Sequence, residues 1–214
     1  MPVAAVLFDN DGLLLDTEHL WTLAETELFE RHGVVFTPEH KRELLGTSGD
    51  RTAAILARLL GQPERGHELA REMGEILFAQ AEHPAHPMPG ALALLDTVEA
   101  AGLRRGLASN SPRTFVDRVV DAAGIRDRFD AILTVDDVAR PKPAPDLYLA
   151  LAAALGADPG DCVALEDSPT GVAAARAAGV YTIGVPSLPG VALGEADLVC
   201  DSLSDPRVAR TLTG

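Results

Sequence analysis

The sequence of 214 residues has only two cysteines, Cys162 and Cys200, which lie far apart in apolar surroundings. They do not form the closely spaced pairs that bind zinc, so we expect two buried free thiols and no zinc site. Long apolar runs are absent too. The first run, residues 3–8, has no basic leader, and no run approaches the length that spans a bilayer. We therefore expect a soluble, cytoplasmic protein.

Positive charge is also scarce, because 18 lysines and arginines face 32 aspartates and glutamates, which gives a net charge of −14. This balance disfavours nucleic acids and anionic membranes as partners. An anionic substrate would need local cations and a metal ion. The length and the 47% hydrophobic content suit one large α/β domain, or a core domain with a smaller insert.

Short apolar runs without alternation are typical of strands that are buried on both faces in a parallel sheet. After residue 90 such runs alternate with helical segments, which predicts right-handed crossovers and a doubly wound, Rossmann-like parallel sheet of the α/β class. The expected strands are residues 3–8, 103–108, 130–135, 162–165 and 180–185.

The gap between the first two expected strands far exceeds an ordinary connection, which predicts an insert. Apolar residues recur at helical spacing within this gap, and nothing there resembles a strand. The proline-rich residues 83–90 suit a stiff linker at its end. We expect residues 1–16 and 85–214 to form the core domain and residues 17–84 to form an α-helical domain inserted into it.

Two strand–turn–helix units share one pattern, in which a serine caps the helix, a proline takes its first position and a glycine closes it. Such helix N-termini offer free amides and a positive dipole end to an anion. The three positions are Ser111, Pro112 and Gly124 in the first unit, and Ser168, Pro169 and Gly179 in the second.

Asp9 and Asp11 directly follow the first strand. Residues i and i+2 of extended backbone project to the same side, so both carboxylates would face one point that can hold a hard cation. Chance alone could supply such a pair in so acidic a chain. However, paired carboxylates at a strand end repel each other, and a structural role without a cation is hard to supply. Gly12 permits a sharp turn after the pair.

Other strand ends bring polar groups to the same edge of the sheet, where ligands bind in this class of fold. Asp9 and Asp167 come from separate strands and are the natural direct ligands of Mg²⁺, which favours carboxylates, waters and a substrate phosphate. Lys142 lies in a loop that alternating prolines stiffen, and would offer a fixed cation to a phosphate. Ser109, Asn110 and Glu166 complete the group.

Each of these residues has an ordinary alternative when it is taken alone. Lys142 would be a solvated loop lysine, and Ser109 would bond only the local backbone. Glu166 and Asp167 would complement a helix dipole. Convergence of all of them at one edge of the sheet favours a functional site.

Four segments in this order resemble the motifs of the haloacid dehalogenase (HAD) superfamily of aspartate-nucleophile phosphatases, and the match runs nearly end to end. The segments are DNDGLLLDTE at residues 9–18, LASNS at 107–111, KPAPD at 142–146 and LEDSPTG at 165–171. The insert after the first motif matches the branch with a helical cap, which includes sugar-phosphate phosphatases and β-phosphoglucomutase. Asn10 is a small departure, because the family usually has an apolar or aromatic residue there.

The resemblance implies that Asp9 is the nucleophile that forms an aspartyl-phosphate, and that Asp11 protonates the leaving alkoxide and then activates water. It implies a Mg²⁺ ion that receives a carboxylate oxygen from Asp9, the backbone carbonyl of Asp11, and a direct or water-mediated bond from Asp167. Glu166 would hold a metal-bound water.

For the phosphoryl group, the resemblance implies that Ser109 and the amide of Asn110 hydrogen-bond its oxygens. Lys142 would neutralise charge as the group moves.

The resemblance also implies that the cap closes over the leaving group and sets selectivity. Thr47 or Arg51 would contact substrate oxygens. Equally, Gly46 would end one helix, and Ser48 or Asp50 would cap the next. Trp21 would line the closed pocket or belong to the core.

We therefore expect a monomeric, Mg²⁺-dependent phosphatase that acts on a small phosphorylated metabolite, a sugar phosphate. The alternative within the family is β-phosphoglucomutase, which has a histidine where this chain has Trp21, although His19 lies two residues away. A dehalogenase would need neither Asp11 nor an acidic metal site. A phospho-acceptor receiver domain would lack the insert, and a silent regulator with this fold would not need every catalytic position filled.

Overall fold

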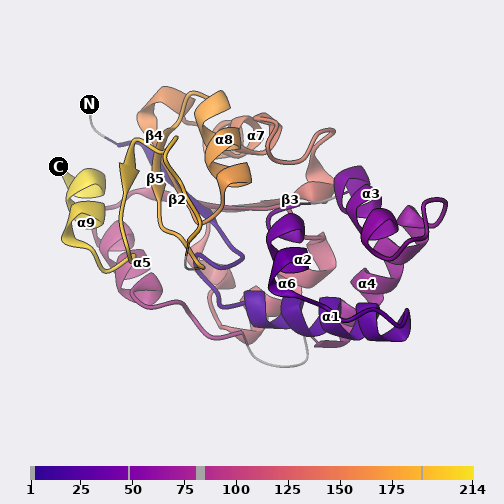
Figure 1. The fold of residues 1–214 in the computed structure, drawn as a ribbon. Coiled ribbons are helices and arrows are strands. Elements are labelled where there is room, and N and C mark those ends of the chain that lie inside the picture. The colour runs from indigo at the N-terminus through magenta and orange to yellow at the C-terminus, as the bar shows by residue number, and fades with distance from the viewer. Residues whose placement is uncertain (1–2, 48, 81–84, 189) are drawn as a thin grey trace.

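The computed structural model describes residues 3–47, 49–80, 85–188 and 190–214. At its centre lies a six-stranded parallel sheet with the order β3-β2-β1-β4-β5-β6 (Figure 1). The five predicted strands are confirmed with ends shifted by one or two residues, and the short β6 was not predicted. The strands are β1 (Ala5–Asp9), β2 (Arg104–Ser109), β3 (Ala131–Thr134), β4 (Cys162–Glu166), β5 (Tyr181–Gly184) and β6 (Leu198–Val199).

Helices cover both faces of the sheet, as the doubly wound prediction requires. Along β1, Val6 and Phe8 join one hydrophobic cluster, while Ala5 and Leu7 join another on the opposite face, because successive side chains of a strand alternate. The first face carries α5 (Ala91–Ala100), α6 (Arg113–Ala122) and α9 (Pro206–Thr213), and the second carries α7 (Asp146–Ala154) and α8 (Pro169–Ala177). Short 3₁₀ turns are η1 (Arg126–Arg128), η2 (Val135–Asp137) and η3 (Pro159–Asp161).

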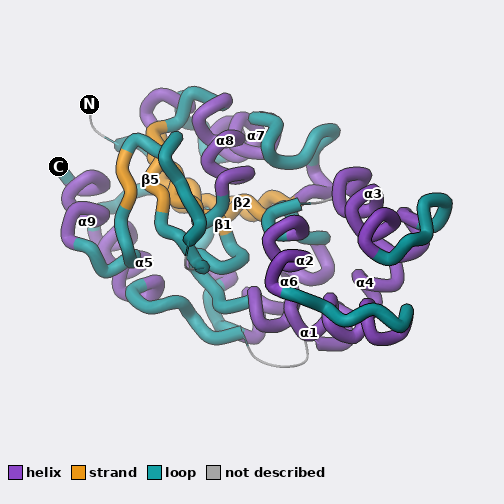
Figure 2. The backbone as a smooth tube through the Cα atoms, in the orientation of Figure 1, coloured by secondary structure: helices purple, strands orange, loops and turns teal. Residues whose placement is uncertain are grey.

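The predicted helical insert is present between β1 and α5, and within the described part of this segment no strand is formed. Its four helices pack at one end of the core, where Figure 2 shows helices and loops only. They are α1 (Glu18–Arg31), α2 (Pro38–Leu44), α3 (Gly49–Leu59) and α4 (Gly66–Gln80). The domain boundaries at residues 16/17 and 84/85 remain predictions.

The two connections between core and insert run side by side. The amide of Asp16 donates to the carbonyl of His86 at 2.8 Å, and the amide of Met88 donates to the carbonyl of Leu14 at 2.8 Å. Backbone bonds therefore join the segment after β1 to the proline-rich segment before α5. His83 and Pro84, the first two residues of the predicted linker, lie outside the described residues.

The capping prediction is correct for one unit and wrong for the other. Ser168 caps α8, because its hydroxyl accepts from the amide of Gly171 at 3.1 Å, and Pro169 takes the first position. Ser111 is not a cap. The N-cap of α6 is Pro112, which has no side-chain cap bond, the helix begins at Arg113, and the Arg113 amide donates to Asp136 Oδ2 at 2.8 Å. The Ser111 hydroxyl instead bonds a carboxylate of the site described below.

Two further expectations have clear outcomes. Cys162 and Cys200 are buried free thiols, as predicted. No helix in the described ranges combines the length and apolar character needed to cross a bilayer.

Candidate active site at the carboxyl edge of the sheet

The topology brings the ends of three strands together. β1 pairs with β2 on one side and with β4 on the other, and the chain adds strands outward in both directions from this point. In such sheets the crevice lies where the order reverses, beyond the carboxyl ends of the strands. Asp9 ends β1, Ser109 ends β2 and Glu166 ends β4.

Lys142 is the centre of a buried charge cluster rather than a solvated lysine. Its Nζ donates to Asp9 Oδ1 at 2.7 Å, to Glu166 Oε1 at 2.6 Å and to the carbonyl of Ala108 at 3.0 Å. The residue is only 5% exposed. Since buried ions are expensive unless they are paired, this geometry fixes the ammonium between the two strand ends.

The carboxylates outnumber the one cation in this cluster. Burial raises the pKa of Asp9 well above its ordinary value, Lys142 opposes this effect, and the charges of Glu166 and Asp11 add to it. Burial lowers the pKa of Lys142, but Asp9 and Glu166 more than reverse this and hold it well above its ordinary value. Excess negative charge in a buried site is relieved by a proton or by a cation.

Asp9, Glu166 and Asp167 form a buried acidic triad that could hold a metal ion. One ligand oxygen from each lies within 4.8 Å of the others. Burial, followed by the charges of Asp9 and Glu166, raises the pKa of Asp167, although Ser187 opposes it by donating to Oδ2 at 2.6 Å. Oε2 of Glu166 is buried and has no hydrogen-bond partner.

Gly12 turns the chain immediately beside this triad. Its φ of +81° lies in the left-handed region, and a Cβ there would lie 2.5 Å from Asp167 Oδ2. The turn and the close approach therefore both require glycine.

Asp11 is placed differently from Asp9 and lies outside the triad. Its Oδ2 accepts from the hydroxyls of Ser109 at 2.6 Å and Ser111 at 2.8 Å, and its Oδ1 accepts from Thr17 at 2.7 Å. The simple expectation that both carboxylates serve one cation is not what the structure shows. Three hydroxyls orient the Asp11 carboxylate.

Asn110 fastens the lysine loop. Its Oδ1 accepts from the Lys142 amide at 2.9 Å, and its Nδ2 donates to the Lys142 carbonyl at 3.1 Å. Ser109 is fully buried, and its Oγ also accepts from the Ser111 amide at 3.0 Å. The bonds of Ser109 and Asn110 to Asp11 and to the lysine loop were not predicted from the sequence.

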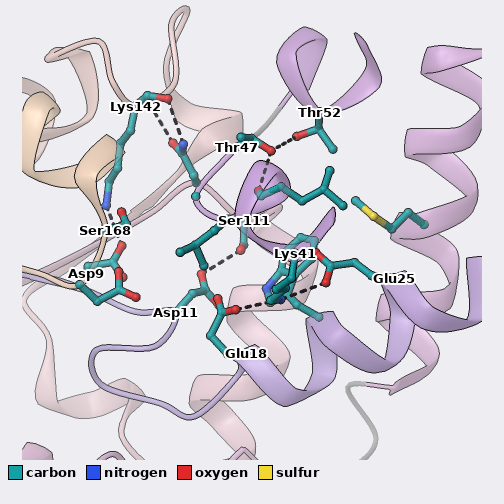
Figure 3. Close-up of a pocket in the computed structure, with 17 residues that line it drawn as sticks. Asp9, Asp11, Glu18, Glu25, Lys41, Thr47, Thr52, Ser111, Lys142 and Ser168 are labelled. Atoms are coloured by element: carbon teal, nitrogen blue, oxygen red, sulfur yellow. Dashed lines mark hydrogen bonds and ion pairs between the residues drawn. The ribbon is translucent and has the colours of Figure 1, made fainter. Parts of the chain in front are cut away.

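A cavity joins this edge of the sheet to the inserted helices (Figure 3). Asp9, Asp11, Lys142 and Asp167 line its core side, together with Asn110, Ser111 and Ser168. The helical side is lined by Glu18, Trp21, Glu25, Lys41, Leu44, Leu45, Gly46, Thr47, Thr52 and Met73.

The predicted residues of the insert fall in different places. Thr47 lines the cavity, and its hydroxyl lies 2.9 Å from that of Thr52. Arg51 is exposed and lines a neighbouring hollow with Pro143 and Pro169 instead. Trp21 lines the cavity and also packs against Phe115, with ring centroids 5.8 Å apart, so both expectations for it hold.

Several residues of the site gave no signal in the sequence. The Tyr148 hydroxyl donates to Glu166 Oε1 from α7, where an aromatic residue reads as ordinary core. Gly171 leaves the space that the Glu166 carboxylate fills, because a Cβ at this position would overlap it. Lys41, on the helical side, sits in a run of charged residues that reads as a solvated helix face.

The fold and the site define a hydrolase class built on a buried aspartate beside a fixed lysine and an acidic triad. Residues 3–179 match the family model of the haloacid dehalogenase-like hydrolases. The chain belongs to this family and is one of its phosphatases.

Relatives with assigned names support this placement. Hexitol phosphatase B of Escherichia coli (strain K12) is 35% identical over 86% of this chain and 84% of its own length. The structure of CbbY from Rhodobacter sphaeroides in complex with phosphate superposes with a TM-score of 0.81 at 32% identity, over 95% of this chain and 96% of that one. β-Phosphoglucomutase from Clostridium difficile gives a TM-score of 0.82 at 25% identity, over 99% and 97%.

Proposed function

We propose that the protein is a Mg²⁺-dependent phosphatase that hydrolyses a small sugar or polyol phosphate through an aspartyl-phosphate on Asp9. The observation that carries the proposal is the buried cluster in which Lys142 joins Asp9 to Glu166 beside Asp167, at the inner end of a cavity. Because the chain as a whole carries a charge of −14, a small anionic substrate needs local cations, and this cluster supplies one.

The residues fit a magnesium ion. Oxygens bound to one Mg²⁺ at about 2.1 Å lie at most about 4.2 Å apart, close to the spacing of the triad. The donors are carboxylates, which this ion prefers. Asp9 and Asp167 would hold it, and Glu166 would hold it directly or through water. When bound, the ion supplies positive charge that lowers the repulsion between a carboxylate nucleophile and a phosphate dianion.

The protein's own residues perform the chemical steps. A carboxylate oxygen of Asp9 attacks phosphorus, and the bond from phosphorus to the leaving oxygen breaks as Asp11 gives that oxygen a proton. Asp11 then takes a proton from water, whose oxygen attacks phosphorus and releases phosphate from Asp9. The hydroxyls of Ser109, Ser111 and Thr17 donate to the Asp11 carboxylate and would keep it in one orientation for these proton transfers.

Lys142 contributes by its fixed position. Two carboxylates hold the ammonium, and Asn110 holds the backbone of Lys142. The ammonium therefore needs no reorganisation when charge develops on the phosphoryl oxygens. The inserted helices line the helical side of the cavity (Figure 3), so they would face the leaving group and recognise it.

The test is phosphate release from a panel of hexitol, hexose and pentose monophosphates, with and without Mg²⁺. Asp9→Asn should lower kcat by about 10⁴-fold or more, because the nucleophile is lost. The matched control is Asp127→Asn, an exposed carboxylate in η1, which should keep wild-type rates. Full activity of Asp9→Asn would overturn the assigned nucleophile.

The mutase is the second candidate, supported by the structural likeness to β-phosphoglucomutase. His19, the residue that kept this possibility open, lies against exposed Asp16 and is not among the cavity-lining residues. Conversion of β-glucose 1-phosphate to glucose 6-phosphate, in place of phosphate release, would establish the mutase instead.

A further inference from the structure

A second cluster of charges lies on the helical side of the cavity. Lys41 Nζ of α2 lies 2.9 Å from Glu18 Oε2 and donates to Glu25 Oε2 at 3.0 Å, both from α1. Glu25 is buried, and Glu18 and Lys41 are mostly buried. All three line the same cavity as Asp9 and Asp11, and in Figure 3 Glu18 lies beside Asp11, whose charge adds to the raised pKa of Glu18. The cluster contains two carboxylates for one ammonium.

The lysines of the two clusters are the only cations among the described residues that line this cavity. Each already faces two carboxylates: Lys142 faces Asp9 and Glu166, and Lys41 faces Glu18 and Glu25. Lys142 is needed at the reacting phosphate. No lining cation therefore remains to neutralise a second anionic group on the substrate.

The helical side is well suited to hydroxyl groups. Carboxylates accept hydrogen bonds from hydroxyls, an ammonium donates up to three bonds, and the paired hydroxyls of Thr47 and Thr52 lie on the same wall. Charge-assisted bonds of this kind are stronger than neutral ones. An uncharged, polyhydroxylated leaving group would find both donors and acceptors here.

The chain maintains this cluster against an unfavourable environment. Burial raises the pKa of Glu25 to about 7, even though Lys41 opposes the shift. Burial also raises the pKa of Glu18. Burying two such carboxylates lowers the stability of the fold. Carboxyl groups with shifted pKa values in a cleft are typical of functional positions.

We propose that Glu18, Lys41 and Glu25 recognise the far end of the leaving group, selecting an uncharged polyol and rejecting a second phosphate or a carboxylate. This inference rests on the proposed function and specifies its substrate class as monophosphates of polyhydroxylated, uncharged compounds. Rejection follows from repulsion, because above the Glu25 pKa of about 7 two carboxylates face one ammonium, and a second anion would enter the cavity beside this net negative cluster.

The experiment compares kcat/KM for a hexitol monophosphate and for the 1,6-bisphosphate of the same hexitol. The wild type should prefer the monophosphate by about 100-fold. At pH 8, above the pKa of Glu25, the substitution Glu25→Gln keeps the shape and a hydrogen-bonding group but removes one negative charge. It should reduce the preference about tenfold, chiefly by lowering KM for the bisphosphate.

Two controls separate recognition from general damage. Glu30→Gln removes the same charge from an exposed position on α1 and should leave the preference unchanged. The second control is the circular dichroism spectrum of Glu25→Gln, which should match that of the wild type and shows that the variant folds. An unchanged preference in Glu25→Gln, or a wild type that hydrolyses both hexitol phosphates equally well, would overturn the proposal.

A binding measurement distinguishes this proposal from the proposed function. Calorimetry with Asp9→Asn, and with Asp9→Asn combined with Glu25→Gln, compares affinity for the two hexitol phosphates without turnover. Preference for the monophosphate that weakens in the double variant supports the recognition cluster, even if the wild type releases no phosphate from any substrate. Equal affinity for both ligands would refute the recognition role of the cluster without contradicting the proposed phosphatase activity.

Discussion

Both ends of the cavity use a lysine between two carboxylates, but they hold it in different ways. On the core side, Lys142 lies between Asp9 and Glu166, which end neighbouring strands. On the helical side, Lys41 lies between Glu18 and Glu25, which come from one helix. The core cluster is more deeply buried. It is also held by the hydrogen bond from the Lys142 amide to Asn110 and by the one from the Tyr148 hydroxyl to Glu166.

This difference indicates what each end can vary. The geometry of the core cluster follows from the register of a parallel sheet, so its parts are fixed relative to the reacting atoms. The helical cluster depends on the packing of α1 against α2, and a different choice of charged residue there would change recognition without disturbing the sheet. The chemistry is therefore separated from the selectivity within one cavity.

Of the substitutions that test this comparison, loss of the core lysine should have the largest effect. Lys142→Met leaves the buried carboxylates of Asp9 and Glu166 unpaired and should lower the free energy of unfolding by about 3–5 kcal/mol. The activity of the remaining folded enzyme should fall by about 10³-fold, because the fixed cation is lost. Denaturant unfolding and steady-state kinetics measure the two effects.

Lys41→Met, on the helical side, should affect KM far more than kcat. An equal loss of kcat in Lys142→Met and Lys41→Met would contradict the division between the two ends of the cavity.

Gly171→Ala tests how tightly the core cluster is packed. Alanine normally favours a helix, but here its Cβ would displace the Glu166 carboxylate, so we expect a loss of about 3 kcal/mol and about a 100-fold fall in kcat. Gly74→Ala is the matched control, since α4 has open space at that position and the change should be neutral or stabilising. Retention of full activity by Gly171→Ala would show that Glu166 tolerates displacement.

Glu25→Gln should reveal the energetic strain of the helical cluster through pH. The pKa of Glu25 is about 7 in the folded chain against an ordinary value of 4.5, so the unfolded chain binds fewer protons between these two values. The contribution of Glu25 to the free energy of unfolding therefore falls as pH rises from 4.5 to 7 and is level above 7. Because glutamine does not titrate, the variant should gain about 3 kcal/mol on the wild type across this window. Denaturant unfolding at a series of pH values measures the difference, and a difference independent of pH would refute the shifted pKa.

The smallest effects on stability should come from removing helix caps at the two ends of the cavity. Ser168→Ala removes the cap of α8. Thr37→Ala removes the cap of α2, because the Thr37 hydroxyl accepts from the His40 amide at 3.4 Å. Each should cost about 1 kcal/mol of stability. Since α2 carries Lys41, the Thr37 variant should also raise KM for a polyol phosphate, with kcat unchanged. Thermal melting and kinetics distinguish the two variants.

The sheet and its strand ends could be predicted because parallel strands buried on both faces leave continuous apolar runs in the sequence. Asp9, Lys142 and Glu166 followed from the same reasoning, since the carboxyl ends of such strands meet at one edge. The two-residue β6 left no such run. A serine before proline fits the pattern of a helix cap, but the Ser111 hydroxyl donates instead to the half-buried carboxylate of Asp11.

Tertiary contacts decided the features that sequence could not reveal. In the sequence nothing distinguishes Tyr148 from a core aromatic, and only the packing of α7 against β1, β2 and β3 brings its hydroxyl to Glu166. Lys41 and Glu25 are separated by 16 residues and come from different helices. Their pairing depends on how α1 and α2 meet, which no local periodicity specifies.

The placement of the lysines has a consequence for chemical labelling. Lys41 and Lys142 are the only lysines in the sequence, and the basic residues outside the cavity are arginines. Amine-reactive reagents would therefore find no lysine on the outer surface, and the labelling of both side chains would depend on access to the cavity. The rate of lysine modification thus becomes a direct readout of how often the cavity opens, and a bound leaving group would slow it first at Lys41.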